Sequence, residues 1–195
     1  MSKEEILTIL QKTNVLQQGH FRFTSGRHSD KYMQCAQLLQ YPNYAAILCG
    51  ELASHFQGDD IDLVIGPALG GILVAYEVAR HLGVRAIFAE READNKMVLR
   101  RGFQVRKGER VLVVEDVVTT GASVNEVTEI VNVEGGQVVG IGMLVDRSRG
   151  RADFGIKTVP LLKLDLIDYA PAECPLCRQG IPLIKPGSRK IAGDK

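Results

Sequence analysis

The sequence has no tryptophan, only four cysteines, and no apolar run close to the ~20 residues that a membrane-spanning helix requires. Four scattered cysteines are too few for a disulfide scaffold in a chain of 195 residues. A formal net charge of +1 gives no overall basis for binding nucleic acid or an anionic membrane. The N-terminal stretch MSKEEILTIL is amphipathic and acidic, unlike a signal peptide. These absences predict a cytoplasmic protein that binds neither membrane nor nucleic acid.

What the sequence does contain is an ordinary globular composition, with 45% apolar and 24% charged residues. Short apolar runs alternate with helical patterns along most of the chain. The expected strands cover 61–65, 84–89, 111–114, 137–145 and 158–164, and the expected helices cover 42–56, 72–82 and 123–133. Such alternation, with right-handed crossovers, predicts an α/β fold: a doubly wound, mainly parallel sheet flanked by helices.

The N-terminal part departs from this alternation. A helix is expected over 3–17, ended by Gly19. The stretch Phe21–Ser29 then alternates like a strand and closes in a polar turn, and 31–34 predicts a second short strand. Residues 1–40 are therefore expected to form the N-terminal helix and a small hood.

The C-terminal tail after Asp168 contains four prolines and predicts an irregular extension over 169–195. The whole chain, 1–195, is expected to be a single domain. In the tail, Cys174 and Cys177 form C-P-L-C, which has the appearance of half a zinc knuckle. No second cysteine pair or nearby histidine in the sequence completes four ligands, so a plain tight turn is favoured over structural metal or redox chemistry.

One stretch carries the clearest chemical signal: Val111–Ser123, which reads VLVVEDVVTTGAS. Its first four residues are apolar without polar alternation, as in a strand buried on both faces of a parallel sheet. The adjacent carboxylates Glu115 and Asp116 follow, and then a turn of small and hydroxylated residues leads into a helix. Carboxylates accept hydrogen bonds from ribose hydroxyls, and such a loop offers N–H groups, hydroxyls and a helix N-terminus to phosphate. The stretch predicts a site for a phosphorylated sugar.

Two details of this stretch can be tested by the structure. Adjacent residues on a strand point to opposite faces of its sheet, so both carboxylates reach one ribose only if the strand ends by Glu115 or Asp116. An alternative for the loop is an ordinary strand–helix junction, in which Ser123 and Glu126 form a capping box. That role does not account for the acidic pair.

Three other loops belong to the same edge of the predicted sheet, because ligands of open α/β sheets bind beyond the carboxyl ends of the strands. Gly66–Gly71, GPALGG, suits close backbone approach to a pyrophosphate, or only a tight helix–sheet contact. The basic stretch 91–108 either closes over a pyrophosphate leaving group or forms a solvated hairpin. Asp146 and Arg147 end a strand, where the arginine fork suits a carboxylate, although a surface ion pair is the simpler alternative.

Val111–Ser123 resembles the phosphoribosyl pyrophosphate (PRPP) binding motif of the type I phosphoribosyltransferases. The stretch FRFTSGRHS at 21–29 is similar to the N-terminal signature of the orotate phosphoribosyltransferase family, and Arg147 falls where that family has its orotate-binding arginine. The tail CPLCRQGIPLIKPGSRK resembles the C-terminal extension of one bacterial branch, often called the Thermus type. The resemblance spans nearly the whole chain and implies the type I phosphoribosyltransferase fold.

The resemblance also implies a reaction. Orotate would displace pyrophosphate from PRPP, with Mg²⁺ assisting, to give orotidine 5′-monophosphate in pyrimidine biosynthesis. Arg147 would pair with the orotate carboxylate, and Thr119 would also approach orotate. No residue is assigned as a metal ligand. The residues implied to bind PRPP are Glu115, Asp116, Val117, Val118, Thr119, Thr120, Gly121, Ala122 and Ser123.

Two catalytic residues are implied in the basic stretch. Arg91 matches a basic residue at the foot of the catalytic loop, which in this family closes over the neighbouring subunit's site in a homodimer. The K-D-H/Y-G core of many relatives reads D-N-K-M here, at 94–97, so Lys96 is assigned the role of the missing loop lysine. Arg100 and Arg101 are the alternatives.

Two further positions depart from the family pattern. The lysine expected before Ser-Gly is Thr24 here, and the Tyr-Lys pair expected after the G-P-A turn is Leu69-Gly70. Several cationic contacts with pyrophosphate and orotate therefore lack their expected residues.

Two other functions fit parts of the sequence. A purine phosphoribosyltransferase acting on xanthine or adenine would keep the PRPP chemistry, but Arg147 and the stretch at 21–29 favour orotate. A non-catalytic, PRPP-sensing regulator would account for the altered loop. The near-neutral chain has neither an added helix-turn-helix nor a broad basic face for nucleic acid.

Overall fold

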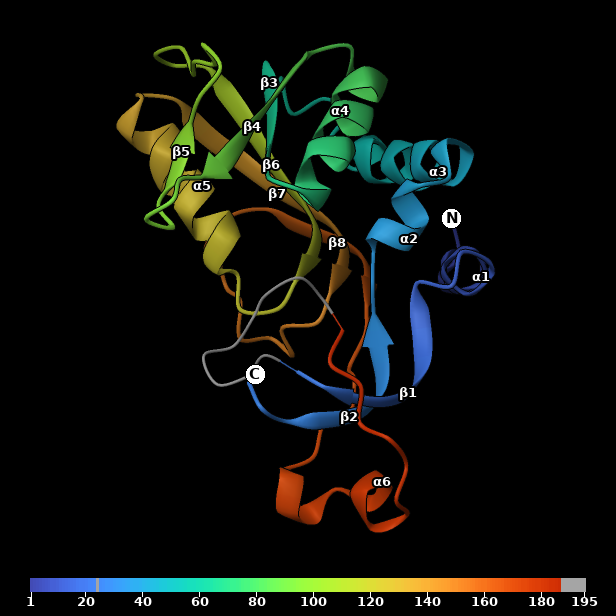
Figure 1. Cartoon of the computed structure of the whole chain (residues 1–195). Coiled ribbons are helices and arrows are strands. Elements are labelled where there is room, and N and C mark those ends of the chain that lie inside the picture. Colours follow the sequence, from blue (N-terminus) through green and yellow to red (C-terminus); the bar gives the residue numbers. More distant parts are fainter. Residues whose placement is uncertain (24, 187–195) are drawn as a thin grey trace.

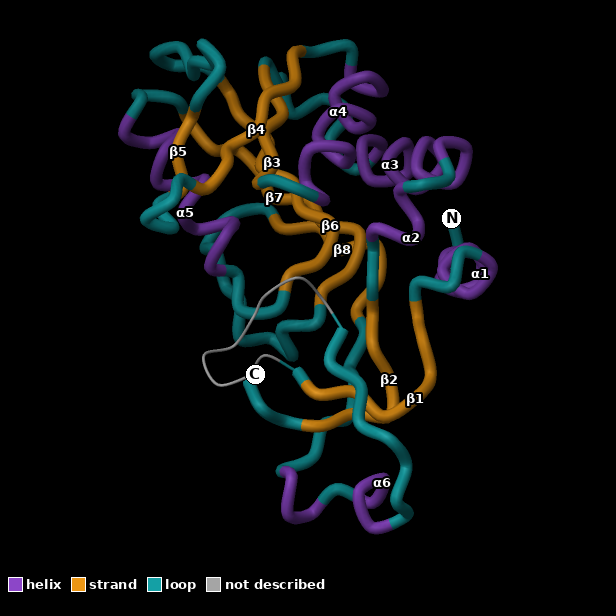
Figure 2. The backbone as a smooth tube through the Cα atoms, viewed as in Figure 1, coloured by secondary structure: helices purple, strands orange, loops and turns teal. Residues whose placement is uncertain are grey.

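The computed structural model describes residues 1–23 and 25–186. Thr24 and the end of the predicted extension, 187–195, lie outside the described residues. Figures 1 and 2 show the elements in space. In chain order they are α1 (Lys3–Lys12), β1 (Leu16–Arg22), β2 (His28–Met33), α2 (Ala36–Leu39), α3 (Pro42–Ser54), β3 (Leu63–Pro67), α4 (Gly70–Leu82), β4 (Arg85–Arg91), β5 (Met97–Leu99), β6 (Arg110–Val118), α5 (Ala122–Val133), β7 (Gln137–Asp146), β8 (Thr158–Lys163), the 3-10 helix η1 (Pro171–Glu173) and α6 (Pro175–Arg178).

The main sheet has six strands in the order β5-β4-β3-β6-β7-β8. All neighbouring pairs are parallel except β4 with β5. The prediction of a doubly wound, mainly parallel sheet is therefore confirmed. No helix among the described residues is both long enough and apolar enough to cross a bilayer.

Alternate residues of the central strand β6 belong to two different cores. Leu112 and Val114 pack in the core that contains the buried side chains of α3 and α4. Val111 and Val113 pack in the core beneath α5. All four side chains are fully buried, which is why this run reads as apolar without alternation. Helices therefore cover both faces of the sheet (Figure 1).

The N-terminal hood is an antiparallel hairpin of β1 and β2, separate from the main sheet. The C-terminal tail runs along this hairpin: Phe21 forms a parallel bridge with Ile184, and His28 an antiparallel bridge with Tyr169. Figure 1 shows α6 beyond the hairpin, on the side away from the sheet. The two ends of the chain thus form one substructure.

Several predicted boundaries near the N-terminus are wrong. The first helix ends at Lys12 rather than at residue 17, because Asn14 takes a left-handed φ of 54° that a continuing helix does not allow. Gly19 lies within β1 and therefore does not end the helix. The first hairpin strand covers Leu16–Arg22 rather than the stretch from Phe21, the second covers His28–Met33 rather than 31–34, and α2 was not predicted.

The central motif also differs from the prediction in two ways. β6 does not end at the acidic pair but continues to Val118, with Glu115 opposite Met143. The capping box is wrong as well: α5 begins at Ala122, its N-cap residue is Gly121, and no side chain caps it. Glu126 instead forms an ion pair with Arg91.

The basic stretch 91–108 is not irregular throughout. It contains the short strand β5, which turns back antiparallel to β4 through residues 92–96. A hairpin is one of the two alternatives that the sequence left open for this stretch. It extends the sheet at the edge beside β4.

Candidate active site

The acidic pair lies against the glycine turn between β3 and α4. A Cβ added to Gly70 would lie 2.3 Å from Asp116 Oδ2, and one added to Gly71 would lie 3.3 Å from Glu115 Oε1. Both carboxyl groups therefore approach one turn although they are adjacent on a continuing strand. A side chain at position 70 would overlap with Asp116, so glycine allows the close approach of the turn to the acidic pair.

Local hydrogen bonds explain how two neighbouring side chains share this place. The N–H of Asp116 donates to Glu115 Oε1 at 3.1 Å, and the N–H of Val117 donates to Asp116 Oδ1 at 2.8 Å. Each carboxyl group therefore folds over onto the backbone N–H of the residue that follows it. The expectation that the strand ends by Glu115 or Asp116 is wrong, because the carboxyl groups fold over locally while β6 continues to Val118.

Both carboxyl groups are shielded from water, and this changes their acidity. Burial raises the pKa of Glu115 well above its usual range, and the neighbouring Asp116 charge adds to the rise. Burial also raises the pKa of Asp116, while the hydrogen bond with Glu115 acts in the opposite direction. Two buried acids side by side are unfavourable when ionised and are suited to a cation or to hydroxyl donors.

The loop after β6 forms a small cavity of about 50 Å³. All of the predicted PRPP-binding residues except Asp116 line it. Gly121 has φ 81°, and a Cβ there would lie 3.0 Å from the ring of Phe154, so the turn into α5 requires glycine. The side chains of Thr119 and Thr120 are exposed at the mouth of the loop.

A second and larger cavity, of about 540 Å³, shares Thr119 and Thr120 with the first. It joins the carboxyl edge of the sheet to the N-terminal hairpin and the tail, since its walls come from all three. Its lining residues are mostly polar or cationic: Phe23, Ser25, Arg27, Tyr32, Thr119, Thr120, Arg147, Arg149, Arg151, Leu166, Asp168, Lys185 and Pro186.

Arg147 is the most enclosed of these cations. Its backbone N–H donates to Val118 O at 2.8 Å, which extends the β6–β7 pairing by one residue. Its Nε is buried and has no hydrogen-bond partner within the described part of the chain, and its Cζ lies 5.5 Å from the centre of the Phe23 ring. Burial lowers the pKa of Arg147, yet a guanidinium stays protonated at neutral pH. The site thus presents a fixed cation with an unused donor.

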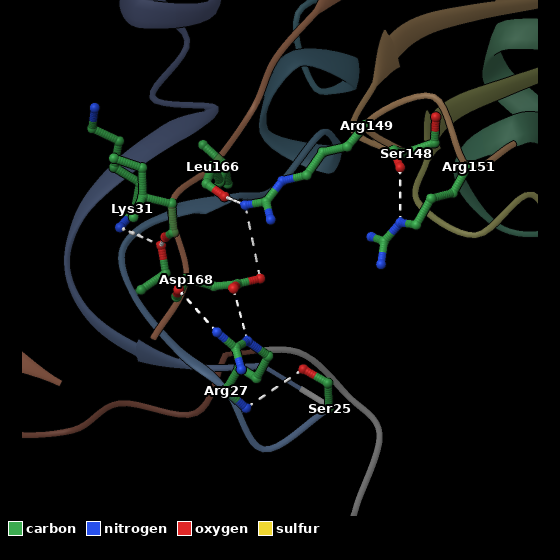
Figure 3. Close-up of polar contacts among 10 residues, drawn as sticks. Ser25, Arg27, Lys31, Ser148, Arg149, Arg151, Leu166 and Asp168 are labelled. Atoms are coloured by element: carbon green, nitrogen blue, oxygen red, sulfur yellow. Dashed lines mark hydrogen bonds and ion pairs between the residues drawn. The ribbon is translucent and has the colours of Figure 1, made fainter. Parts of the chain in front are cut away.

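Three more arginines surround this cavity and were not recognised from the sequence. Figure 3 shows Arg27, Arg149 and Arg151 with the single carboxylate Asp168. Arg27 donates to Asp168 Oδ1 at 2.7 Å, Arg149 lies 3.9 Å from Asp168 Oδ2, and Arg151 Nε donates to Ser148 O at 2.9 Å. One acid therefore serves two of the cations, which leaves the cavity positively charged.

A signal for these residues was present. Ser148–Arg151, S-R-G-R, directly follows Arg147 at the end of β7, where loops of the active edge are expected. Arg27 belongs to the stretch 21–29 that was compared with the family signature but was given no role. Counting the cationic residues at the end of β7 would have identified Arg149 and Arg151.

The structure does not bring Arg91 and Lys96 to either cavity. Arg91 pairs with Glu126 and donates to Asn95 O at 2.6 Å, so it ties the β4–β5 hairpin to α5. Lys96 is exposed on the hairpin and makes no ion pair with any residue the structure describes. Of the alternatives, Arg101 lies 3.1 Å and Arg100 3.9 Å from Glu90.

The raised pKa of Glu115 predicts a pH-dependent contribution to stability. A carboxyl whose pKa is higher in the folded state binds more protons there than in the unfolded chain, so folding loses stability as pH rises above the usual value near 4.5. Glu115→Gln cannot ionise and should be more stable than the parent protein at neutral pH, with a flatter pH dependence.

Urea unfolding of both proteins between pH 4 and pH 8 would measure this difference. Glu115→Gln is expected to unfold at higher urea than the parent near neutral pH, and the gap should narrow towards acid pH. Parallel pH profiles for the two proteins would contradict the assignment of a raised pKa.

Comparisons with known proteins agree with this geometry. The family model "Phosphoribosyl transferase domain" matches residues 35–175. Orotate phosphoribosyltransferases of Pelotomaculum thermopropionicum and Caldanaerobacter subterraneus are each 60% identical to the chain over 191 residues, which is 98% of this chain and 100% of theirs. The crystal structure of orotate phosphoribosyltransferase from Aeropyrum pernix superposes with a TM-score of 0.67 at 28% identity, over 82% of this chain and 93% of that one. The chain belongs to the orotate phosphoribosyltransferase family of type I phosphoribosyltransferases.

Proposed function

We propose that this protein transfers the ribose 5-phosphate of PRPP to orotate, giving orotidine 5′-monophosphate and pyrophosphate in pyrimidine biosynthesis. The observation that carries the proposal is Arg147, a half-buried cation whose buried Nε has no hydrogen-bond partner among the described residues, in a cavity that shares its threonines with the loop after β6. Relatives that are 60% identical over their full length carry the corresponding name. The cytoplasmic location expected from the sequence stays a prediction.

The PRPP side of the site would consist of the acidic pair and the loop. Glu115 and Asp116 would accept hydrogen bonds from the ribose hydroxyls, which suits two buried carboxyl groups that face one turn. The loop from Thr119 to Ser123 would surround the 5′-phosphate. This role is supported by the groups that the loop presents: exposed hydroxyls, and the N-terminal N–H groups of α5, which have no partners within the helix.

The orotate side would be the larger cavity. Arg147 would pair with the orotate carboxylate, because a guanidinium fork matches a carboxylate in two parallel hydrogen bonds. Thr119, which lines both cavities, would lie between the base and the sugar phosphate. The further cations Arg27, Arg149 and Arg151 would favour an anionic base over a neutral purine.

Mg²⁺ fits the donor set of the acidic pair. It prefers carboxylate oxygens supplemented by substrate phosphates, and Glu115 and Asp116 would hold it together with PRPP. A cation there would favour the ionised form of two carboxyl groups whose pKa values are raised by burial. When bound, Mg²⁺ would offset negative charge on the departing pyrophosphate.

The reaction itself needs no covalent intermediate with the protein. The ring nitrogen of orotate, after losing its proton to solvent, forms a bond to C1′ of the ribose while the bond from C1′ to the pyrophosphate oxygen breaks, with inversion at C1′. Positive charge develops on the ribose and negative charge on pyrophosphate. Carboxylates beside the ribose and cations beside the leaving group would stabilise both charges.

We further propose a homodimer in which the β4–β5 hairpin serves the neighbouring site. Arg91 and Lys96 line neither of these two cavities of their own chain, which fits an action in trans. Leu69, Leu73 and Tyr76 lie on one face at the start of α4, and 83%, 48% and 62% of their surfaces are exposed. A row of exposed apolar side chains is typical of an interface.

An assay of base specificity tests the proposed function. The purified protein is mixed with PRPP, Mg²⁺ and orotate, the ultraviolet absorbance is followed, and the assay is repeated with xanthine and with adenine. Turnover of orotate alone is expected. Turnover of a purine without orotate would identify a purine phosphoribosyltransferase, and PRPP binding without any turnover would identify a regulator.

Arg147→Ala should raise the KM for orotate far more than the KM for PRPP. A charge-assisted hydrogen bond contributes about 1.5–3 kcal/mol, which corresponds to a rise of about 10- to 100-fold. Arg147→Lys is the matched control: it keeps the charge but loses the fork, so a smaller rise is expected. Equal effects on the KM values of both substrates would remove the assigned role of Arg147.

Single alanine substitutions of Lys96, Arg100 and Arg101 should identify the loop cation by the largest fall in kcat. Lys96 is expected to show it, because the other two side chains approach Glu90. A mixture of Lys96→Ala and Arg147→Ala subunits should recover activity if the loop acts in trans, up to about a quarter of the parent value after random exchange. No recovery in exchanged dimers would show that the loop acts within its own subunit.

A further inference from the structure

Four metal-binding side chains meet between the N-terminal hairpin and the C-terminal tail. His20 comes from β1 and His28 from the start of β2, while Cys174 and Cys177 come from the C-P-L-C segment at α6. Their ligand atoms all lie within 4.8 Å of one another. The sequence predicts a plain turn here because no histidine lies near the two cysteines along the chain, but the fold brings two histidines to them.

Four of the six distances between the ligand atoms are close to the edges of one coordination tetrahedron. Zinc binds histidine nitrogen at about 2.0–2.1 Å and cysteine sulfur at about 2.3 Å, so tetrahedral edges are about 3.3 Å between nitrogens and about 3.5 Å between nitrogen and sulfur. His20 Nε2 lies 3.1 Å from His28 Nδ1 and 3.4 Å from Cys174 Sγ. Cys177 Sγ lies 3.3 Å from His28 Nδ1 and 3.7 Å from His20 Nε2.

Hydrogen bonds among these groups do not account for the arrangement. His20 Nδ1 lies 2.7 Å from the carbonyl oxygen of Ile181, which can only accept, so the His20 ring carries its proton on Nδ1. Nε2 then has one lone pair and no proton, yet three potential ligand atoms lie within 3.7 Å of it. A lone pair directed at a shared centre is what a metal ligand presents, and a carbonyl behind the ring is the usual second contact of such a histidine.

We propose that His20, His28, Cys174 and Cys177 bind one structural zinc ion. Two thiolates and two imidazoles in a tetrahedral arrangement are typical of zinc, and four protein ligands leave no open position for catalysis. A two-iron cluster would need the cysteines and the histidines to bind different irons, which does not suit four ligand atoms converging on one point. His20, His28 and Cys174 are buried, and only Cys177 reaches the surface.

The ion would fasten the tail to the hairpin that forms one wall of the large cavity. Backbone hydrogen bonds already join the two: His28 N to Tyr169 O at 2.9 Å, Tyr169 N to His28 O at 2.7 Å and Ile184 N to His20 O at 2.8 Å. Beyond this seam, Arg27 from the hairpin turn pairs with Asp168 from the tail. Because small irregular segments bury little apolar surface, a metal is a common means of fixing them.

Metal analysis of the full chain, produced without a histidine tag, tests this proposal. Elemental analysis should give about one zinc per chain for the parent protein, and replacement by Co²⁺ should give the absorption of tetrahedral cobalt with thiolate ligands. Cys177→Ser is expected to lose most of the zinc while keeping its circular dichroism spectrum, because Cys177 is exposed. Cys49→Ala, a buried cysteine of α3 outside the cluster, should keep its zinc.

A further readout is thermal stability. Removal of zinc by a chelator should lower the Tm of the parent protein by roughly 5 °C or more, and added zinc should restore it. The Tm of Cys177→Ser should not respond to chelator. The proposal is overturned if the reduced parent protein holds no zinc, if it holds iron instead, or if Cys177→Ser and His28→Gln both retain the metal.

Discussion

The site depends on the close approach of two adjacent carboxyl groups, one buried and one half-buried, to a glycine-rich turn. A Cβ at position 70 would lie 2.3 Å from Asp116 Oδ2, so Asp116 approaches the start of α4 this closely only because residue 70 has no side chain. The carboxyl groups of Glu115 and Asp116 accept hydrogen bonds from the backbone N–H groups of the residues that follow them. Burial raises the pKa of both, which makes the pair a place for hydroxyl donors or a cation rather than for a second anion.

The cations line the larger cavity, which shares Thr119 and Thr120 with the loop cavity, and they come from distant parts of the chain. Arg147 follows β7, whereas Arg27 comes from the N-terminal hairpin and is held by Asp168 from the tail. A positively charged wall of this kind keeps its shape only if the hairpin and the tail stay together. The cysteine and histidine cluster lies on the same two segments, so the proposed zinc ion would also hold this wall of the cavity in place.

The main sheet and the position of the acidic pair and its loop could be predicted from the sequence, because the signals for them are local. The apolar run of β6, the acidic pair and the loop into α5 are contiguous, and the doubly wound sheet follows from alternation. What failed depends on contacts between distant residues: His20 and Cys174 are 154 positions apart, and no spacing rule joins them. The predicted end of β6 was wrong for a different reason. Alternation along a strand gives the face of the sheet from which each side chain starts, but not how that side chain then folds.

The central proposal is that Arg147, the acidic pair and the loop at 119–123 bind the base, the ribose and the phosphate of one ligand, orotidine 5′-monophosphate. A crystal structure of the complex with this nucleotide tests it most directly. The account predicts the ribose hydroxyls at Glu115 and Asp116, the phosphate in the loop at 119–123, and the carboxylate of the base paired with Arg147. A complex in which the carboxylate binds Arg27 or Arg149 instead, with Arg147 still unpaired, would contradict it.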